Sequence, residues 1–340
     1  MITTIPMEID KYQIIKPLGS GCFGQVYHVL DRALSEEKAI KVLFCSDTSE
    51  FMHQLQEAQI QNKCQHKHIV SINEANIFPV NGTNRVVLDL EYIPEGSLEA
   101  ALSMRWVSIR ESVQYIRGAL LGLEHAHAHG FLHRDVKPGN ILLSPNAPKL
   151  SDFGLATAVG DSLAGSAKGY RTHLPPECYR TSSTSEQTDI FAMGMTLFRS
   201  LTNIADWLGC VNRVPNYAFH MEKGTLVQQI GFADFLPDTI RSIVRKACHL
   251  ETGKRFATAR DFGQSLDKLR FNINWIREDG NTWRGECSAG KQHTCHTDPA
   301  NNNVTVTING RRDRSKCSNH TSLEEAVKQM HRHIAETTVD

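Results

Sequence analysis

The spacing of apolar and polar residues divides the chain into three parts with different expected structures. In the first third, short alternating or β-branched runs are separated by glycines and turn residues, which predicts strands. Residues 50–63 are instead rich in Gln, Glu, Leu and Met, and this composition favours a helix. The predicted strands cover residues 12–17, 26–30, 38–43, 70–76 and 85–92, and Asn81-Gly82 forms the turn between the last two.

From Ser97 onward the pattern changes to helices. Between Ser108 and Gly130, apolar residues recur every three or four positions, and the glycine ends the run. Similar segments cover residues 187–202, 238–249 and 258–270. A strand-rich first third followed by a helical body predicts an α+β fold with two lobes.

The composition changes near Phe271, and the segment that follows predicts a small β-sheet plus a helix. Val304–Ile308 alternates β-branched residues and ends in Asn309-Gly310, a typical hairpin turn. Residues 322–335 carry apolar side chains at helical spacing. We therefore expect residues 271–340 to form a small α+β accessory module.

The overall composition is that of a globular protein. Of 340 residues, 40% are hydrophobic and 22% are charged, with 37 Lys+Arg against 37 Asp+Glu. These values exclude general disorder, and the zero net charge argues against nucleic acid or an acidic membrane as the main partner. The first residues do not resemble a signal peptide, no apolar run is long enough to cross a membrane, and the nine cysteines include no CxxC pair. We expect a cytoplasmic protein with reduced thiols.

Seven short motifs follow one another between the predicted strands and helices. A glycine-rich loop alone would be a weak signal, because a plain hairpin turn also uses glycine. The order and spacing of the whole set are far more specific. The motifs are Gly19–Val26 (GSGCFGQV), Ala39–Lys41 (AIK), Gln65–Val70 (QHKHIV), Leu88–Leu98 (LDLEYIPEGSL), His133–Asn140 (HRDVKPGN), Asp152–Gly154 (DFG) and Pro175–Glu177 (PPE).

From about Tyr12 to Arg270, this ordered set resembles the motifs of the eukaryotic-like Ser/Thr protein kinase family. The resemblance implies a two-lobed kinase fold that uses ATP and Mg²⁺. It also implies transfer of the γ-phosphate to a Ser or Thr of a protein substrate. The expected domains are a kinase domain at 1–270, with an N-lobe at about 10–93 and a C-lobe at about 94–270, and the accessory module at 271–340, where we expect a partner or regulator to bind.

The resemblance assigns the nucleotide site to the N-lobe and to the hinge between the lobes. Glycines let backbone N–H groups approach phosphates closely, where a Cβ would collide. Lys41 would neutralise phosphate oxygens and needs a carboxylate partner, for which Glu57 is the first choice and Glu50 the competitor. Backbone groups of Glu91 and Ile93 would bind adenine. The implied nucleotide-binding residues are Gly19, Ser20, Gly21, Cys22, Phe23, Gly24, Val26, Ala39, Lys41, Glu57, Leu90 (the gatekeeper), Glu91, Ile93 and Leu142.

The resemblance places the catalytic residues in the HRDVKPGN and DFG segments. Asp135 would orient the attacking hydroxyl and accept its proton. Lys137 would bind the γ-phosphate, as is typical of Ser/Thr kinases. Asn140 and Asp152 would hold Mg²⁺, a hard cation that prefers oxygen ligands. Together with Lys41, Asp135 and Lys137 make up the implied catalytic set.

The same resemblance assigns structural and regulatory residues. Asp189 would anchor the catalytic loop from a buried helix, and Glu177 would pair with Arg255. Arg134 is typical of kinases that a phosphate in the activation segment switches on. The segment before Glu177 is slightly longer and more basic than the family pattern, which indicates an unusual or acidic target. The candidate phosphorylation sites are Ser162, Ser166 and Thr172.

Three other functions stay open at this point. One is a catalytically weak or inactive kinase, a scaffold whose C-terminal module is the effector. Another is a small-molecule kinase on the same fold, which the HRDVKPGN and PPE segments argue against. In the third, the tail binds nucleic acid and the kinase controls it. The basic run Arg311–Lys316 would serve that function, but a solvated turn is favoured in a module of balanced charge.

The tail also contains two tryptophans and several zinc-type residues. We expect Trp275 and Trp283 to form the core of the small sheet. The spacing of the zinc-type residues matches no common finger or ribbon, so solvated polar side chains are favoured over a metal site. These residues are Cys287, His293, Cys295, His296, Cys317 and His320.

Overall fold

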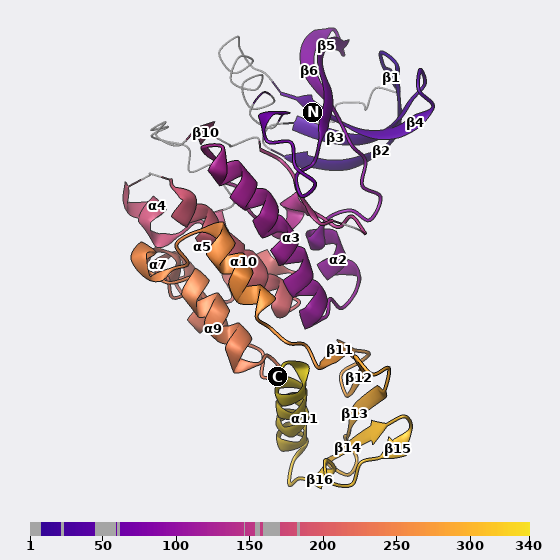
Figure 1. Ribbon diagram of the computed structural model, residues 1–340, viewed down its shortest axis with the longest axis vertical. Coiled ribbons are helices and arrows are strands. Elements are labelled where there is room, and N and C mark those ends of the chain that lie inside the picture. The colour runs from indigo at the N-terminus through magenta and orange to yellow at the C-terminus, as the bar shows by residue number, and fades with distance from the viewer. Residues whose placement is uncertain are drawn as a thin grey trace.

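Figure 1 shows a strand-rich lobe at the N-terminal end, a helical lobe in the middle, and a small sheet with one helix at the C-terminal end. This arrangement confirms the predicted α+β fold class. The predicted helix at 50–63 lies almost wholly outside the described residues. The computed structural model describes residues 8–21, 24–44, 59, 62–145, 147–153, 157–158, 171–181 and 184–340.

The N-lobe is an antiparallel sheet in the order β1-β2-β3-β4-β6-β5. Asn81 and Gly82 have φ angles of 51° and 76°, as the tight turn between β5 and β6 requires. The strands predicted at 70–76 and 85–92 are confirmed, with bounds shifted to 72–80 and 83–90. The first begins later than predicted because Val70 N donates to Leu150 O of the C-lobe, at 2.9 Å. The strands are β1 (Glu8–Ile9), β2 (Tyr12–Gly21), β3 (Gly24–Asp31), β4 (Glu36–Leu43), β5 (Ile72–Val80) and β6 (Thr83–Leu90).

The C-lobe is built around α5 (Glu186–Leu201), which is buried at every residue from Thr188 onward. α3 (Ile109–Ala128) packs beside it and begins at a capping box made by Ser108 and Glu111. The helices predicted at 187–202, 238–249 and 258–270 are confirmed. The other helices are α2 (Leu98–Met104), α4 (Pro176–Thr181), α6 (Trp207–Asn212), α7 (Tyr217–Glu222), α8 (Leu226–Ile230), α9 (Asp238–Ala247) and α10 (Ala259–Asp267).

Short elements join these helices and shape the site. α2, α4, α6, α7 and α8 have seven residues or fewer, so hydrophobic periodicity does not predict them. Within the described residues, none of the helices combines the length and the apolar character that crossing a membrane requires. The remaining short elements are strands β7 (Phe131–Leu132), β8 (Ile141–Leu142), β9 (Lys149–Leu150) and β10 (Thr157–Ala158) and the 3-10 turns η1 (Pro138–Asn140), η2 (Arg171–His173) and η3 (Thr252–Lys254).

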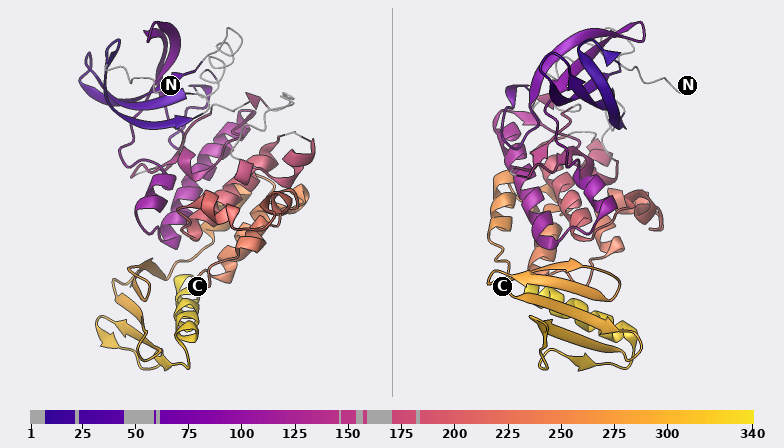
Figure 2. Two further views of the ribbon diagram at one scale, coloured as in Figure 1. Left: turned by 180° about the vertical axis from the view of Figure 1, so that it is seen from behind. Right: turned by 90° about the vertical axis from the view of Figure 1, so that its right-hand side faces the viewer.

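The last part of the chain is an antiparallel sheet with a helix across one face (Figure 2). Asn309 and Gly310 form the predicted hairpin turn, with φ angles of 49° and 76°. Trp275 and Trp283 are 2% and 1% exposed, which confirms their predicted place in the core. The elements are β11 (Ile273–Arg277), β12 (Thr282–Cys287), β13 (Gln292–Asp298), β14 (Asn303–Ile308), β15 (Arg311–Arg312), β16 (Ser318–Asn319) and α11 (Leu323–Thr338).

An aromatic cluster joins this small sheet to the C-lobe. Trp283 of β12 lies edge-on to Trp106, with the ring centroids 5.2 Å apart. Phe235, just before α9, lies 4.9 Å from the Trp283 ring and 5.6 Å from the Trp106 ring. His331 of α11 lies 5.6 Å from Phe235. The small sheet and the C-lobe therefore share one continuous core, at the end of the molecule opposite the N-lobe (Figures 1 and 2).

Candidate active site

The register of β3, β4 and β6 gathers the predicted nucleotide-contacting side chains on one face of the N-lobe sheet. Val26 pairs with Lys41, and Ala39 pairs with Leu90. Because directly paired residues share a face and alternate residues of a strand share a face, these four side chains line the same surface. Leu142 approaches from the C-lobe, where β8 carries it.

The glycine-rich motif is the hairpin end of β2 and β3. Gly19 pairs with Val26, and Gly21 pairs with Gly24, while Ser20 lies between them in β2. A Cβ at Gly24 would lie 2.3 Å from the carbonyl oxygen of Val42, so only glycine fits there. The loop tip, Cys22-Phe23, lies outside the described residues.

The hinge leaves two backbone groups available for a ligand. The Glu91 carboxylate accepts hydrogen bonds from Ser71 N at 2.7 Å and Lys149 Nζ at 2.8 Å, which fix this side chain. The Glu91 carbonyl and the Ile93 N–H have no hydrogen bond to any other described residue. An acceptor next to a donor matches the edge of adenine, so the hinge fits the base that the sequence implies.

Lys41 contacts Asp152 across the two lobes, with 2.5 Å between Nζ and Oδ1. Burial alone would raise the pKa of the Asp152 carboxyl, but Lys41 outweighs it, so the pKa lies below the ordinary value. Asp152 has a φ angle of 60°, in the left-handed region that non-glycine residues seldom adopt. Glu57, the partner predicted for Lys41, lies outside the described residues, as does Glu50.

The segment His133–Asn140, called here the catalytic loop, brings together the other three polar residues of the predicted site, Asp135, Lys137 and Asn140. Lys137 Nζ lies 2.6 Å from Asp135 Oδ2. The Asn140 Nδ2 group donates to Asp135 O at 2.8 Å and to Asp135 Oδ2 at 3.1 Å. These bonds occupy the amide nitrogen and leave the amide oxygen, the atom that binds hard cations, outside them. Together with the Asp152 carboxylate, this oxygen makes a donor set that fits a divalent ion such as Mg²⁺.

Asp189 of α5 holds the backbone of the catalytic loop by hydrogen bonds, as predicted. Its carboxylate accepts the backbone N–H of His133 and of Arg134, each at 2.8 Å, and lies 2.9 Å from His127 Nε2. Burial alone would raise the pKa of Asp189, but these partners, His127 first, keep it below the ordinary value. Arg134 has a φ angle of 67°, so the loop next to Asp135 keeps a strained conformation that Asp189 stabilises.

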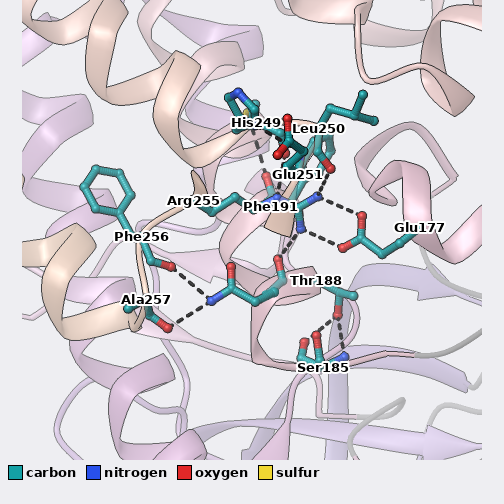
Figure 3. A network of polar contacts seen from close by, with 12 residues as sticks. Glu177, Ser185, Thr188, Phe191, His249, Leu250, Glu251, Arg255, Phe256 and Ala257 are labelled. Carbon is teal, nitrogen blue, oxygen red and sulfur yellow. Dashed lines mark hydrogen bonds and ion pairs between the residues drawn. The ribbon is translucent and has the colours of Figure 1, made fainter. Parts of the chain in front are cut away.

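The predicted pair between Glu177 and Arg255 is also confirmed (Figure 3). Two parallel bonds join the guanidinium to the carboxylate, at 2.6 and 2.7 Å. Arg255 is fully buried in its side chain and also donates to the carbonyls of His249 and Gln187, each at 2.8 Å. Because α4 carries Glu177, this pair attaches the end of the activation segment to the C-lobe.

The activation segment, which runs from Asp152 to Glu177, is described only in part. Its strand β10 pairs with β7, next to the catalytic loop. Ser162 and Ser166, two of the predicted phosphorylation sites, lie outside the described residues. Thr172, the third, is 7% exposed, and its hydroxyl oxygen accepts a hydrogen bond from Trp207 Nε1 at 2.7 Å. A hydroxyl held in this way is not presented to another active site, which counts against Thr172 as a phosphate acceptor.

The zinc-type residues of the tail are the next predicted candidates, for a metal site. Within the part of the chain that the structure describes, no three His, Cys, Asp or Glu side chains come together as a metal site. Cys295 is fully buried beside Val306 in the sheet, and Cys317 Sγ bonds the backbone of the same Val306. These two cysteines therefore belong to the packing of the small sheet, and the expectation of a solvated side chain was wrong for Cys295, which lies in the sheet core.

Residues 12–265 match the protein kinase domain family. The chain belongs to this family. The family uses ATP and a divalent metal ion, in keeping with the hinge and with the oxygen donors of Asn140 and Asp152.

The family's curated Ser/Thr members include several bacterial proteins that resemble this chain. Serine/threonine-protein kinase PknB of Mycolicibacterium smegmatis is 27% identical over 277 residues, which cover 78% of this chain and 44% of that protein. PrkC of Bacillus subtilis is 27% identical over 276 residues, or 79% and 42% of the two chains. The probable PknB of Lactococcus lactis is 31% identical over 261 residues, or 74% and 41%. The chain thus spans less than half the length of these relatives.

Proposed function

We propose that this protein is an ATP-dependent serine/threonine protein kinase, which transfers the γ-phosphate of ATP to a Ser or Thr hydroxyl of a protein substrate. The observation that carries this proposal is the grouping of five polar side chains between the lobes. Lys41 donates a hydrogen bond to Asp152, and Lys137 and Asn140 donate hydrogen bonds to Asp135. Two ammonium groups, two carboxylates and one amide are the groups that this reaction needs. The similarity to named Ser/Thr kinases supports the same choice.

Each of these side chains has a distinct role in the proposed reaction. Asp135 accepts a hydrogen bond from the substrate hydroxyl and takes its proton late, since an alcohol is a very weak acid. Lys41 and Lys137 bind phosphate oxygens and balance the negative charge that develops on them. Asn140 and Asp152 hold the divalent ion, for which we propose Mg²⁺. When bound, the ion adds positive charge at the phosphates.

The nucleotide site follows from the N-lobe face and the hinge. The Glu91 carbonyl and the Ile93 N–H pair with the adenine edge, and apolar side chains above and below enclose the ring. The backbone of the glycine hairpin covers the phosphates, since the absence of side chains lets the backbone approach them. The proposed apolar wall consists of Val26, Ala39, Leu90 and Leu142.

We also propose that phosphorylation of the activation segment regulates the enzyme, with Ser162 or Ser166 as the acceptor. Arg134 next to the catalytic Asp135 supports this, because a phosphate pairs strongly with a guanidinium. Thr172 is not proposed, since Trp207 holds its hydroxyl. An inactive scaffold has no observation in its favour, because every group needed for phosphate transfer is present.

The domain limits are proposed as 1–270 for the kinase domain and 271–340 for an accessory module that binds a protein partner or regulator. Backbone pairing supports the limit at Arg270, because Asn272 N donates to Thr338 O at 2.9 Å and so joins the two ends of the module. A polar row on the outer face of the sheet supports the partner role: Arg284, Thr294, Thr307 and Arg312 pair across β12–β15, and the exposed Ile276 of β11 ends the row. We also propose a cytoplasmic location, which the free thiols of the seven described cysteines support.

A phosphate-transfer assay tests the proposed activity. Full-length protein is incubated with radiolabelled ATP, Mg²⁺ and casein, and the labelled residues are identified by mass spectrometry. We expect label on Ser or Thr, and a loss of about 100-fold or more in Asp135→Asn. Asp238→Asn is the matched control, because this carboxylate lies outside the site and is 88% exposed. Equal labelling by wild type and Asp135→Asn would overturn the proposal.

A further inference from the structure

Two buried side chains lie outside the sequence motifs: Trp207 contacts the segment just before Pro175, and Arg199 contacts Trp207. Trp207 begins α6 and is 1% exposed, and its indole N–H donates to the Thr172 hydroxyl at 2.7 Å. The Trp207 ring also lies 5.6 Å from the His173 ring. The segment Thr172–Pro175, called here the substrate-facing loop, is therefore packed on Trp207.

Arg199 supports Trp207 from the inside of α5. Its guanidinium lies over the indole ring, 5.7 Å from the centroid, and its side chain is fully buried. A buried charge of this kind is stable only when acceptors surround it. Its bonds to acceptors run to the Glu99 carboxylate of α2, to Ile204 O at 3.2 Å and to Ala205 O at 3.3 Å. These bonds fix the Arg199 guanidinium, against which the Trp207 indole packs.

The same loop borders the catalytic aspartate. A small pocket is lined by Asp135 and Val136 of the catalytic loop on one side and by His173, Leu174 and Pro175 on the other. His173 is 2% exposed. Burial, with the positive charges of Arg199 and Lys137 nearby, holds the pKa of His173 well below its ordinary value, so the imidazole is neutral. A neutral ring adds no third positive charge near these two cations.

We propose that Trp207 and Arg199 are positioning residues for the protein substrate. They hold the substrate-facing loop against the catalytic loop, so that a polypeptide lying on this loop presents its hydroxyl to Asp135. The inference rests on the proposed kinase function, and it extends that function to residues that touch neither nucleotide nor metal. The chain of contacts runs from Glu99 through Arg199 and Trp207 to Thr172.

The proposal separates the two substrates of the reaction. The nucleotide-contacting residues lie on the N-lobe sheet, in the hinge and on β8, whereas the contacts of Trp207 and Thr172 run to His173, Phe198 and Arg199. Loosening the loop should therefore weaken use of the protein substrate and leave use of ATP unchanged. A purely structural role would instead lower the active fraction, and both substrates would then show the same loss.

Trp207→Phe is the central variant, because it keeps an aromatic ring and removes the indole donor together with part of the ring. Steady-state kinetics are measured with casein and ATP varied in turn. Because one buried hydrogen bond is lost, we expect KM for casein to rise about tenfold, with KM for ATP unchanged. Trp106→Phe is the matched control, since the Trp106 ring lies at the junction with the small sheet, against Phe235 and Trp283.

Two further variants act on the other end of the same bond. Thr172→Val removes the acceptor and should reproduce the effect of Trp207→Phe, whereas Thr172→Ser keeps the hydroxyl and should restore the wild-type KM. Both changes break the bond between Trp207 and Thr172, and Thr172→Val also removes the contact of the Thr172 hydroxyl with His173 Nδ1 at 3.3 Å. Trp207→Phe combined with Thr172→Val should therefore cost less than the sum of the two single effects. Thr172→Val also serves if Trp207→Phe fails to fold. Additive effects, or equal losses for casein and ATP, would overturn the proposal.

Hydrogen exchange gives a readout that does not depend on catalysis. In Trp207→Phe and Thr172→Val, but not in Thr172→Ser, the backbone amides between Thr172 and Cys178, where Pro175 and Pro176 carry none, should exchange faster, while those of β11–β14 stay unchanged. If the wild type transfers no phosphate at all, the proposed kinase function fails, and this measurement alone decides the positioning contact. Unchanged exchange over residues 172–178 would then reject the contact.

Discussion

Replacing Arg255 by methionine should show how strongly the end of the activation segment is attached to the C-lobe. The side chain is fully buried, and its guanidinium makes two bonds to Glu177 (Figure 3). Methionine has a similar length and no charge, so the variant removes the bonds while filling most of the space. What remains is a carboxylate without its cation and backbone carbonyls without their donor.

The expected cost follows from these groups. Removing one partner of a buried ion pair costs about 3–5 kcal/mol, because the other charge is left without compensation. Glu177 is 16% exposed, so water reaches it only in part, and we expect about 4 kcal/mol for Arg255→Met. Glu177→Gln keeps an acceptor for the guanidinium and should cost about 2 kcal/mol. In the double variant the two losses overlap, and we expect about 4 kcal/mol rather than the sum.

The measurement is equilibrium urea unfolding followed by circular dichroism. The wild type, both single variants and the double variant complete the cycle. Lys254→Met is the matched control: it removes a neighbouring cation from an exposed pair with Glu251 and should change the free energy of unfolding by less than about 0.5 kcal/mol. Additive losses, or a loss below about 1 kcal/mol in Arg255→Met, would refute the coupling that we infer from the geometry.

Three further predictions concern the catalytic loop, the glycine hairpin and the small sheet. The folded pKa of Asp189 lies below its ordinary value of 3.8, so its stabilising effect is complete above that value and is lost as the pH falls through the folded pKa. Asp189→Asn should therefore lower stability at neutral pH and flatten the loss of stability below about pH 4 in urea unfolding, and an unchanged acid profile would contradict this. Gly24→Ala places a Cβ 2.3 Å from Val42 O, so β3 must move away from β4. We expect a loss of about 1–3 kcal/mol in the free energy of unfolding and a higher KM for ATP. Wild-type values for both would show that the two strands are not packed so closely. Trp283→Ala should destabilise the protein by about 3–5 kcal/mol and also raise hydrogen exchange around Trp106, because the two rings share one core; an effect confined to β11–β14 would show that the small sheet is independent.

The strands and helices that the sequence predicts are those with a long local signal. β2, β3 and β4 alternate or carry β-branched residues, and α3 begins at a serine cap and ends at a glycine. The small helices α6 and α7 were beyond such reasoning, because six residues give less than two turns and therefore no measurable period. The order of the motifs was equally informative, since it led to the family that residues 12–265 match.

Other features of the site could not be predicted because they join residues that no local pattern connects. The motif pattern indicated a carboxylate near Lys41, but its contact with Asp152, 111 positions away, depends on how the lobes meet. Thr172 looks like any other hydroxyl of the activation segment, and only the fold shows that Trp207, 35 positions later, holds it. A tryptophan and an arginine spaced by eight residues carry no motif that would have marked Arg199 and Trp207 as neighbours of the site.

The amino-acid sequence was sufficient for the α+β class, the two lobes, the small sheet with its helix, and the set of residues that carry the proposed chemistry. These follow from periodicity, turn residues and motif order, which are local properties of a chain. The tertiary structure alone showed that Lys41 contacts Asp152, how Thr172 is buried, and that Trp283 shares a core with Trp106 and Phe235. Such contacts depend on the packing of elements far apart in the chain, because side chains meet there only after those elements have assembled.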